Sequence, residues 1–77
     1  MEPRNDARAT IQRLLVTGDN RLKHGVALEK VRAGYLAALD AARSAGLEEA
    51  VRPLVELRLA DLDRLAAEAP PPAPPAA

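Results

Sequence analysis

Residues 28–66, LEKVRAGYLAALDAARSAGLEEAVRPLVELRLADLDRLA, decide which fold this chain can adopt. Apolar side chains recur in this stretch every three or four residues, which is the spacing of one face of an α-helix. The run Ser44, Ala45 and Gly46 interrupts the pattern, and helices commonly end at such a glycine. Two helices joined by so short a connection must run antiparallel. We therefore predict an all-α fold built on a long antiparallel helical hairpin, with helices at about 26–45 and 47–68.

Each helix of this hairpin carries one apolar stripe, which we assign to a core or to an interface. The members of the two stripes are Leu28, Val31, Tyr35, Leu39, Val51, Leu54, Val55, Leu59, Leu62 and Leu65. Pro53 lies inside the second stripe, where a proline either kinks a helix or forms its first residue. Both possibilities stay open on the sequence.

Arg58 falls by helical phase inside the apolar stripe of the second helix. A buried guanidinium without a partner is costly, so this position needs an explanation. Its stem could pack while its charged head reaches water at the edge of the hairpin. Alternatively, Arg58 pairs with an acidic side chain across an oligomer or partner interface and fixes its register.

A shorter helix at about 6–17 is predicted before the hairpin. Asn5 or Asp6 can cap its first turn, and an apolar face follows at Ile11, Leu14 and Leu15. Gly18 is expected to end it in a left-handed conformation, and residues 18–25 have the composition of a turn.

The folded domain is therefore expected to span residues 6–68. Residues 1–5 are expected to be disordered, and so is the Pro/Ala-rich tail at 69–77, because proline lacks an amide donor. Assembly of the hairpin into a helical bundle is one way to enlarge the core, since fewer than seventy residues build only a small one. A second apolar surface, which one hairpin cannot cover, is predicted at Leu22, Val26, Leu36 and Leu57.

The run from Tyr35 to Ala42 resembles the second-helix pattern of a tetratricopeptide repeat, Y-x-x-A-L-x-x-A. The resemblance covers about one helix, and a single unit of such an array cannot bury its own apolar face. We interpret the pattern as generic packing within a helical hairpin.

The composition leaves little room for catalysis or for a bound cofactor. The chain has no cysteine and one histidine, which excludes a disulfide and an ordinary zinc site. We expect no enzyme activity and no cofactor. No apolar run approaches the roughly 20 residues that span a bilayer, and the first residues do not resemble a secretion signal, so we expect a cytoplasmic protein.

These observations favour a small protein–protein interaction or oligomerisation module that works by helix packing, as a homodimer or docked on a larger partner. The alternative is a nucleic-acid-associated regulator that uses the basic residues Arg21, Lys23 and Lys30, although the net charge of the chain is zero. Salt-dependent binding to duplex would separate the two functions.

Overall fold

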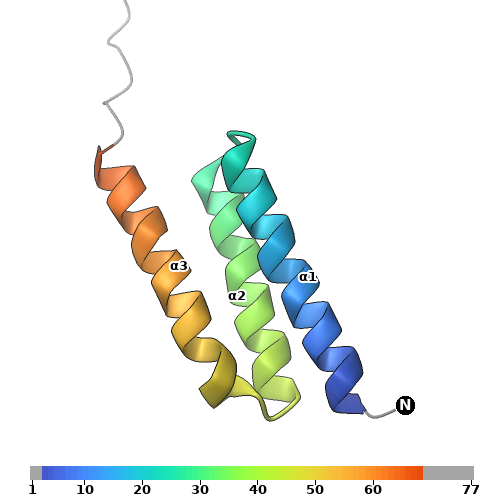
Figure 1. Cartoon of the computed structure of the whole chain (residues 1–77). Helices are drawn as coiled ribbons and strands as arrows, with labels where there is room; N and C mark the ends of the chain where they lie inside the picture. Colours follow the sequence, from blue (N-terminus) through green and yellow to red (C-terminus); the bar gives the residue numbers. More distant parts are fainter. Residues whose placement is uncertain (1–2, 69–77) are drawn as a thin grey trace, which may run out of the picture.

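The computed structural model describes residues 3–68, and in this range the chain forms helices and no strand. The helices are α1 (Pro3–Lys23), α2 (Leu28–Ser44) and α3 (Glu48–Glu68). The predicted all-α class is confirmed. The chain ascends through α1, descends through α2 and ascends again through α3 (Figure 1). The expected disorder of the Pro/Ala-rich tail at 69–77 concerns residues outside the described range.

Both connections between helices are built in the same way, around a glycine in the left-handed region. Gly25 has φ 76° and Gly46 has φ 72°. The amide that follows Gly25 donates to the carbonyl of Arg21 at 3.0 Å, and the amide that follows Gly46 donates to that of Ala42 at 2.7 Å. This is the hydrogen bonding of a Schellman motif, which satisfies helix carbonyls that would otherwise lack a partner. The predicted end of the middle helix near Gly46 agrees with this geometry.

The first helix is longer than predicted at both ends. It begins at Pro3, so residues 3–5 are helical rather than disordered, and Asn5 and Asp6 lie inside the first turns. It also continues to Lys23, so the prediction that it ends at Gly18 is wrong.

Gly18 is inside the helix because α1 and α2 approach each other closely at this point. The residue is buried, and a Cβ atom placed on it would lie 2.6 Å from Cε1 of Tyr35. Real Cβ atoms do not make contacts this short, so the ring fills the space that any larger residue would occupy. The glycine therefore serves side-chain packing, and Gly25 is the residue that ends the helix.

The third helix runs through Pro53 without interruption, so Pro53 is not the first residue of a late-starting helix. It is the sixth residue of α3, and its missing amide removes one hydrogen bond to the preceding turn.

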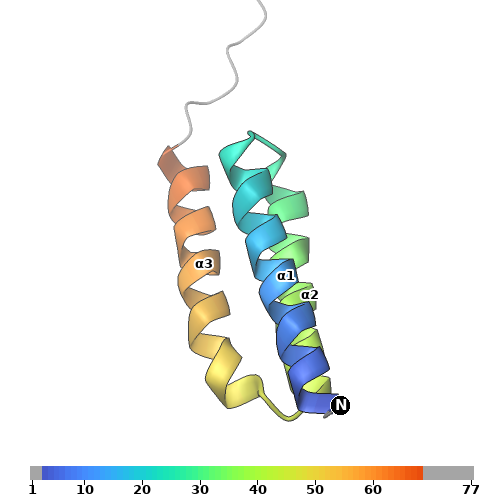
Figure 2. The same cartoon turned by 45° about the vertical axis from the view of Figure 1, so that its right-hand side comes forward.

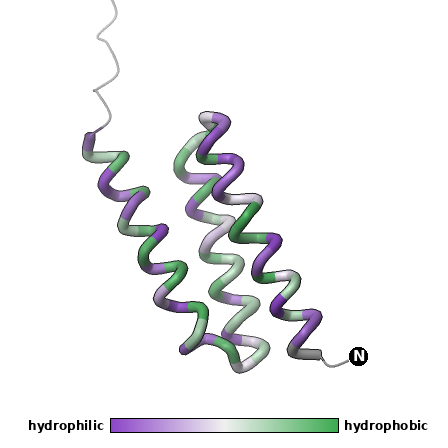
Figure 3. Tube along the Cα trace, viewed as in Figure 1, coloured by the Kyte–Doolittle hydropathy of each residue, from purple (hydrophilic) through white to green (hydrophobic). Residues whose placement is uncertain are grey.

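The core lies along α2, which packs against α1 on one side and against α3 on the other. Apolar and polar residues alternate along all three helices, as expected of helices that bury one side (Figure 3). The buried apolar residues are Ile11, Leu15, Val31, Tyr35, Ala38, Ala42, Leu47, Val51, Val55 and Leu62. Partly buried residues pack around them, among them Leu14, Leu28, Leu39 and Leu59.

Leu22 and Val26 also pack against this core, which differs from their predicted place on a second apolar surface. The reason is the extra length of α1. Leu22 lies seven residues after Leu15 and therefore on the same face of the continued helix. Val26 is the residue after the glycine of the Schellman motif, a position that commonly makes an apolar contact with the helix it follows.

Candidate interaction surface

A hollow of about 300 Å³ lies between α1 and α3, near the connection of α2 to α3. Its walls are mainly aliphatic, and its lining consists of Arg8, Ile11, Gln12, Leu15, Leu47, Ala50, Val51 and Leu54. Leu54 is 47% exposed, although its position in the stripe predicted a residue of the core or an interface. The hollow thus places apolar side chains in contact with solvent.

The hollow exists because α1 and α3 do not pack closely against each other. Each packs on α2, and the two flanking helices stand apart in both views of the molecule (Figures 1 and 2). A helix that buried the facing sides of α1 and α3 would therefore have to come from outside the described part of the chain.

Two further large apolar side chains are exposed on the helices that form the hollow. Val16 is 49% exposed and lies one helical turn after Gln12, a lining residue of the hollow. Leu57 is 64% exposed and follows Leu54 by three residues on α3. Single exposed apolar residues are common on protein surfaces, but Val16 and Leu57 each lie within one helical turn of a residue that lines the hollow. We define Val16, Leu54 and Leu57, together with the hollow, as the groove surface.

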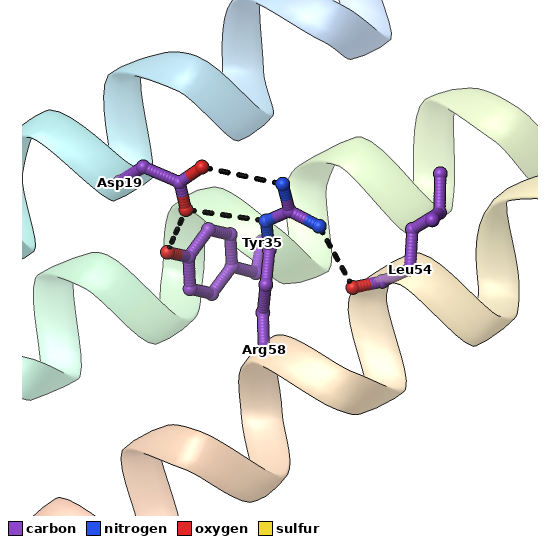
Figure 4. A network of polar contacts seen from close by, with 4 residues as sticks. All are labelled: Asp19, Tyr35, Leu54 and Arg58. Atoms are coloured by element: carbon purple, nitrogen blue, oxygen red, sulfur yellow. Dashed lines mark hydrogen bonds and ion pairs between the residues drawn. The ribbon is translucent and has the colours of Figure 1, made fainter.

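Arg58 connects α3 to α1 at the other end of this region (Figure 4). Its Nε atom donates to Oδ1 of Asp19 at 3.1 Å and its Nη2 atom donates to Oδ2 at 3.2 Å, so the ion pair is bidentate. Its Nη1 atom donates to the carbonyl oxygen of Leu54 at 3.1 Å. The Tyr35 hydroxyl donates to the same Asp19 carboxylate, and the guanidinium carbon lies 5.9 Å from the centre of the Tyr35 ring.

Arg58 has an acidic partner within its own chain. Its acidic partner is Asp19 of the same chain, and its side chain stays 28% exposed at the edge of the core. The sequence did not identify Asp19 as the partner of Arg58, because residues 18–25 were expected to form a turn. In the longer helix it follows Leu15 by one turn, which places it on the side of α1 that faces α3.

The network leaves the Asp19 carboxylate ionised and the Tyr35 hydroxyl protonated near neutral pH. Partial burial alone would raise the pKa of Asp19, but the hydrogen bonds from Arg58 and Tyr35 and the charge of Arg58 outweigh it, so the pKa lies below its usual value. Burial, together with the hydrogen bond to Asp19 and its charge, raises the pKa of Tyr35 to about 12. Neither group is poised to exchange a proton near pH 7, which suits a structural role.

The remaining predicted surface residue, Leu36, lies on a different side of the molecule. It is 45% exposed on α2 and lines a second depression of about 400 Å³, together with Ala33, Ala37, Leu39, Asp40 and Arg43. Neither depression is lined by both Leu36 and Leu57.

The basic residues of the nucleic-acid alternative lie at one end of the molecule. Arg21 and Lys23 are in the last turn of α1, and Lys30 is in the first turn of α2. All three are exposed. Nucleic-acid binding by these three residues stays a prediction.

Within residues 3–68, no group of three or more acidic, histidine or cysteine side chains is arranged to hold a metal ion. None of the described helices combines the length and the apolar character that crossing a membrane requires. Comparisons with protein-family models, with curated proteins and with solved structures find no match to this chain.

Proposed function

We propose that this protein is a non-enzymatic protein–protein interaction module that acts by self-association through the groove surface. In this proposal the three helices are one half of a larger helical bundle, and the bound homodimer is the form that an adaptor or regulator of a larger partner would use. We propose that it acts in the cytoplasm, as expected from the sequence.

One observation carries the proposal: a hollow lined mainly by aliphatic side chains lies open between two helices that do not pack closely against each other. Leu54 lines the hollow and is half exposed, and the exposed Val16 and Leu57 each lie within one helical turn of a residue that lines it. A groove between two helices, lined by aliphatic side chains, is a common binding site for a further amphipathic helix. Covering it would remove apolar surface from water, at about 25 cal/mol for each Å².

The test is the mass in solution, measured by light scattering over a hundredfold range of concentration. We expect a dimer for the unmodified chain. We expect Leu54→Glu to raise the dissociation constant roughly 30-fold or more, because a charge buried without a partner costs at least about 2 kcal/mol.

Leu36→Glu is the matched control, since it places the same charge on an equally exposed leucine of another face. Circular dichroism should show helical spectra for both variants. A chain that stays monomeric over the whole range would overturn the proposal, and so would equal weakening of the dimer by the two substitutions.

A further inference from the structure

A second periodic pattern, besides the buried stripe, runs along α3 from the residue before its first turn. Its positions alternate in steps of three and four residues, as Leu47, Ala50, Leu54, Leu57, Asp61 and Arg64. This is the a and d spacing of a coiled-coil heptad. Only Leu47 of this series is buried within the chain, whereas Ala50, Leu54 and Leu57 are exposed. The series has the spacing of a helix–helix contact, and from Ala50 to Leu57 none of its side chains is buried within residues 3–68.

We propose that the partner is α3 of a second copy, packed antiparallel about a two-fold axis between Leu54 and Leu57. This inference rests on the proposed self-association and adds its geometry. A two-fold contact is made by the same patch on both subunits, so the patch must be complementary to itself. When the series is reversed, Leu54 lies opposite the partner's Leu57, and Ala50 lies opposite the partner's Asp61.

Charge favours the antiparallel direction over the parallel one. Ala50 and Arg8 line the same hollow, so the partner's Asp61 would lie beside Arg8. Arg8 is exposed and belongs to none of the ion pairs found among the described residues. In a parallel pair, Asp61 would instead face the partner's Asp61, and like charges at such positions destabilise the contact.

The existing contact of Asp61 does not compete strongly with this pair. Asp61 forms an ion pair with Arg64 of the same helix, with 3.4 Å between Oδ1 of Asp61 and Nη2 of Arg64. Both side chains are more than half exposed. Exposed pairs of this kind contribute little, about 0–1 kcal/mol, so Asp61 is free to turn towards Arg8. The partner's α3 would also cover Gln12 and Val16 of α1, which extends the contact beyond one pair of helices.

The direction of the two helices can be tested by disulfide formation, because the chain contains no cysteine of its own. We would mix Leu54→Cys and Leu57→Cys chains of different mass and oxidise them. We expect the mixed cross-link to form in large excess over both symmetric cross-links, since Cα atoms must approach within roughly 7 Å for a disulfide. Predominant symmetric cross-links would overturn the antiparallel geometry.

The proposed ion pair can be tested by exchanging its charges. We expect Arg8→Glu and Asp61→Arg each to raise the dissociation constant roughly tenfold, because the pair occurs twice in a two-fold dimer. The double variant should return to within about threefold of the unmodified chain, since it restores opposite charges. Arg13→Glu, at an exposed position five residues along α1, is the control for net charge.

The outcomes separate this inference from the proposed function. A dimer that is lost in Leu54→Glu but shows no rescue in the double charge variant would keep self-association and overturn the Arg8–Asp61 contact. An unmodified chain that is monomeric throughout would overturn both.

Discussion

Two glycines in the middle of helices have opposite roles in this protein. At Gly18 an added Cβ would lie 2.6 Å from Cε1 and 3.0 Å from Cδ1 of Tyr35. At Gly34 an added Cβ would meet nothing within 4 Å. The ring of Tyr35 is fully buried and is not the free end of a flexible side chain, so it has little room to move. The same substitution should therefore have opposite effects at the two positions.

We predict that Gly18→Ala lowers the free energy of unfolding by about 1–3 kcal/mol, the usual cost of overpacking, in spite of the better helix propensity of alanine. Gly34→Ala should raise it by about 0.5–1 kcal/mol, because only the propensity changes. Urea unfolding followed by circular dichroism measures both. Stabilisation by Gly18→Ala would show that Tyr35 does not pack against α1 as described.

At the scale of the helices, Asp19 and Arg58 form the described bridge between α1 and α3. Its dependence on pH follows from the pKa values of its members. The pKa of Asp19 lies below its ordinary value, so its contribution is complete above about pH 4 and is lost as the pH falls through the folded-state pKa. Tyr35 acts in the opposite direction. Its pKa is raised to about 12, so its contribution is complete below about pH 10 and is lost as the pH rises towards 12.

We predict that Asp19→Asn is less stable than the unmodified chain at pH 7 and that this difference shrinks below about pH 4. The effect should be small, on the order of 0.5 kcal/mol, because solvent screens an ion pair whose carboxylate is 46% exposed. Urea unfolding at a series of pH values measures it. Asp40→Asn, at an exposed carboxylate outside the described ion pairs, is the control. A constant difference between the Asp19 variant and the unmodified chain down to pH 2 would contradict the prediction.

Only part of the structure of these helices could be predicted from the sequence. The existence of α2 and α3 followed from their apolar periodicity and from Gly46, because both signals are local. The end of α1 did not follow, because helices commonly end at a glycine and Gly18 was predicted to be that residue. Gly18 instead lies inside the helix, where it contacts the ring of Tyr35, a residue 17 positions further along the chain.

The candidate site was predictable to a similar extent. Helical phase identified Arg58 as an unusual member of the stripe, but its partner Asp19 depended on the length of α1. Leu54 was assigned to a core or an interface, and its exposure follows from the separation of α1 and α3, which no local pattern encodes.

At the scale of the whole molecule, the central question is how a chain with one aromatic residue stays folded. The largest fully buried side chains, Tyr35, Leu62, Val31 and Val55, all belong to α2 and α3, and α1 adds Ile11 and Leu15 at the edge. A core of this size supplies only about 3–5 kcal/mol. Burial of the groove surface in a dimer would add to this free energy of unfolding. Folding and assembly should therefore be coupled.

We predict that the thermal midpoint of the unmodified chain rises with concentration, by about 5–10 °C over a hundredfold range, because mass action favours the folded dimer. Leu54→Glu should melt at a lower temperature that changes less with concentration, since its dimer is weaker. Circular dichroism at several path lengths measures both chains under identical conditions. If the unmodified chain melted at one temperature throughout the range, the single chain would be stable on its own, and the groove surface would not contribute to folding.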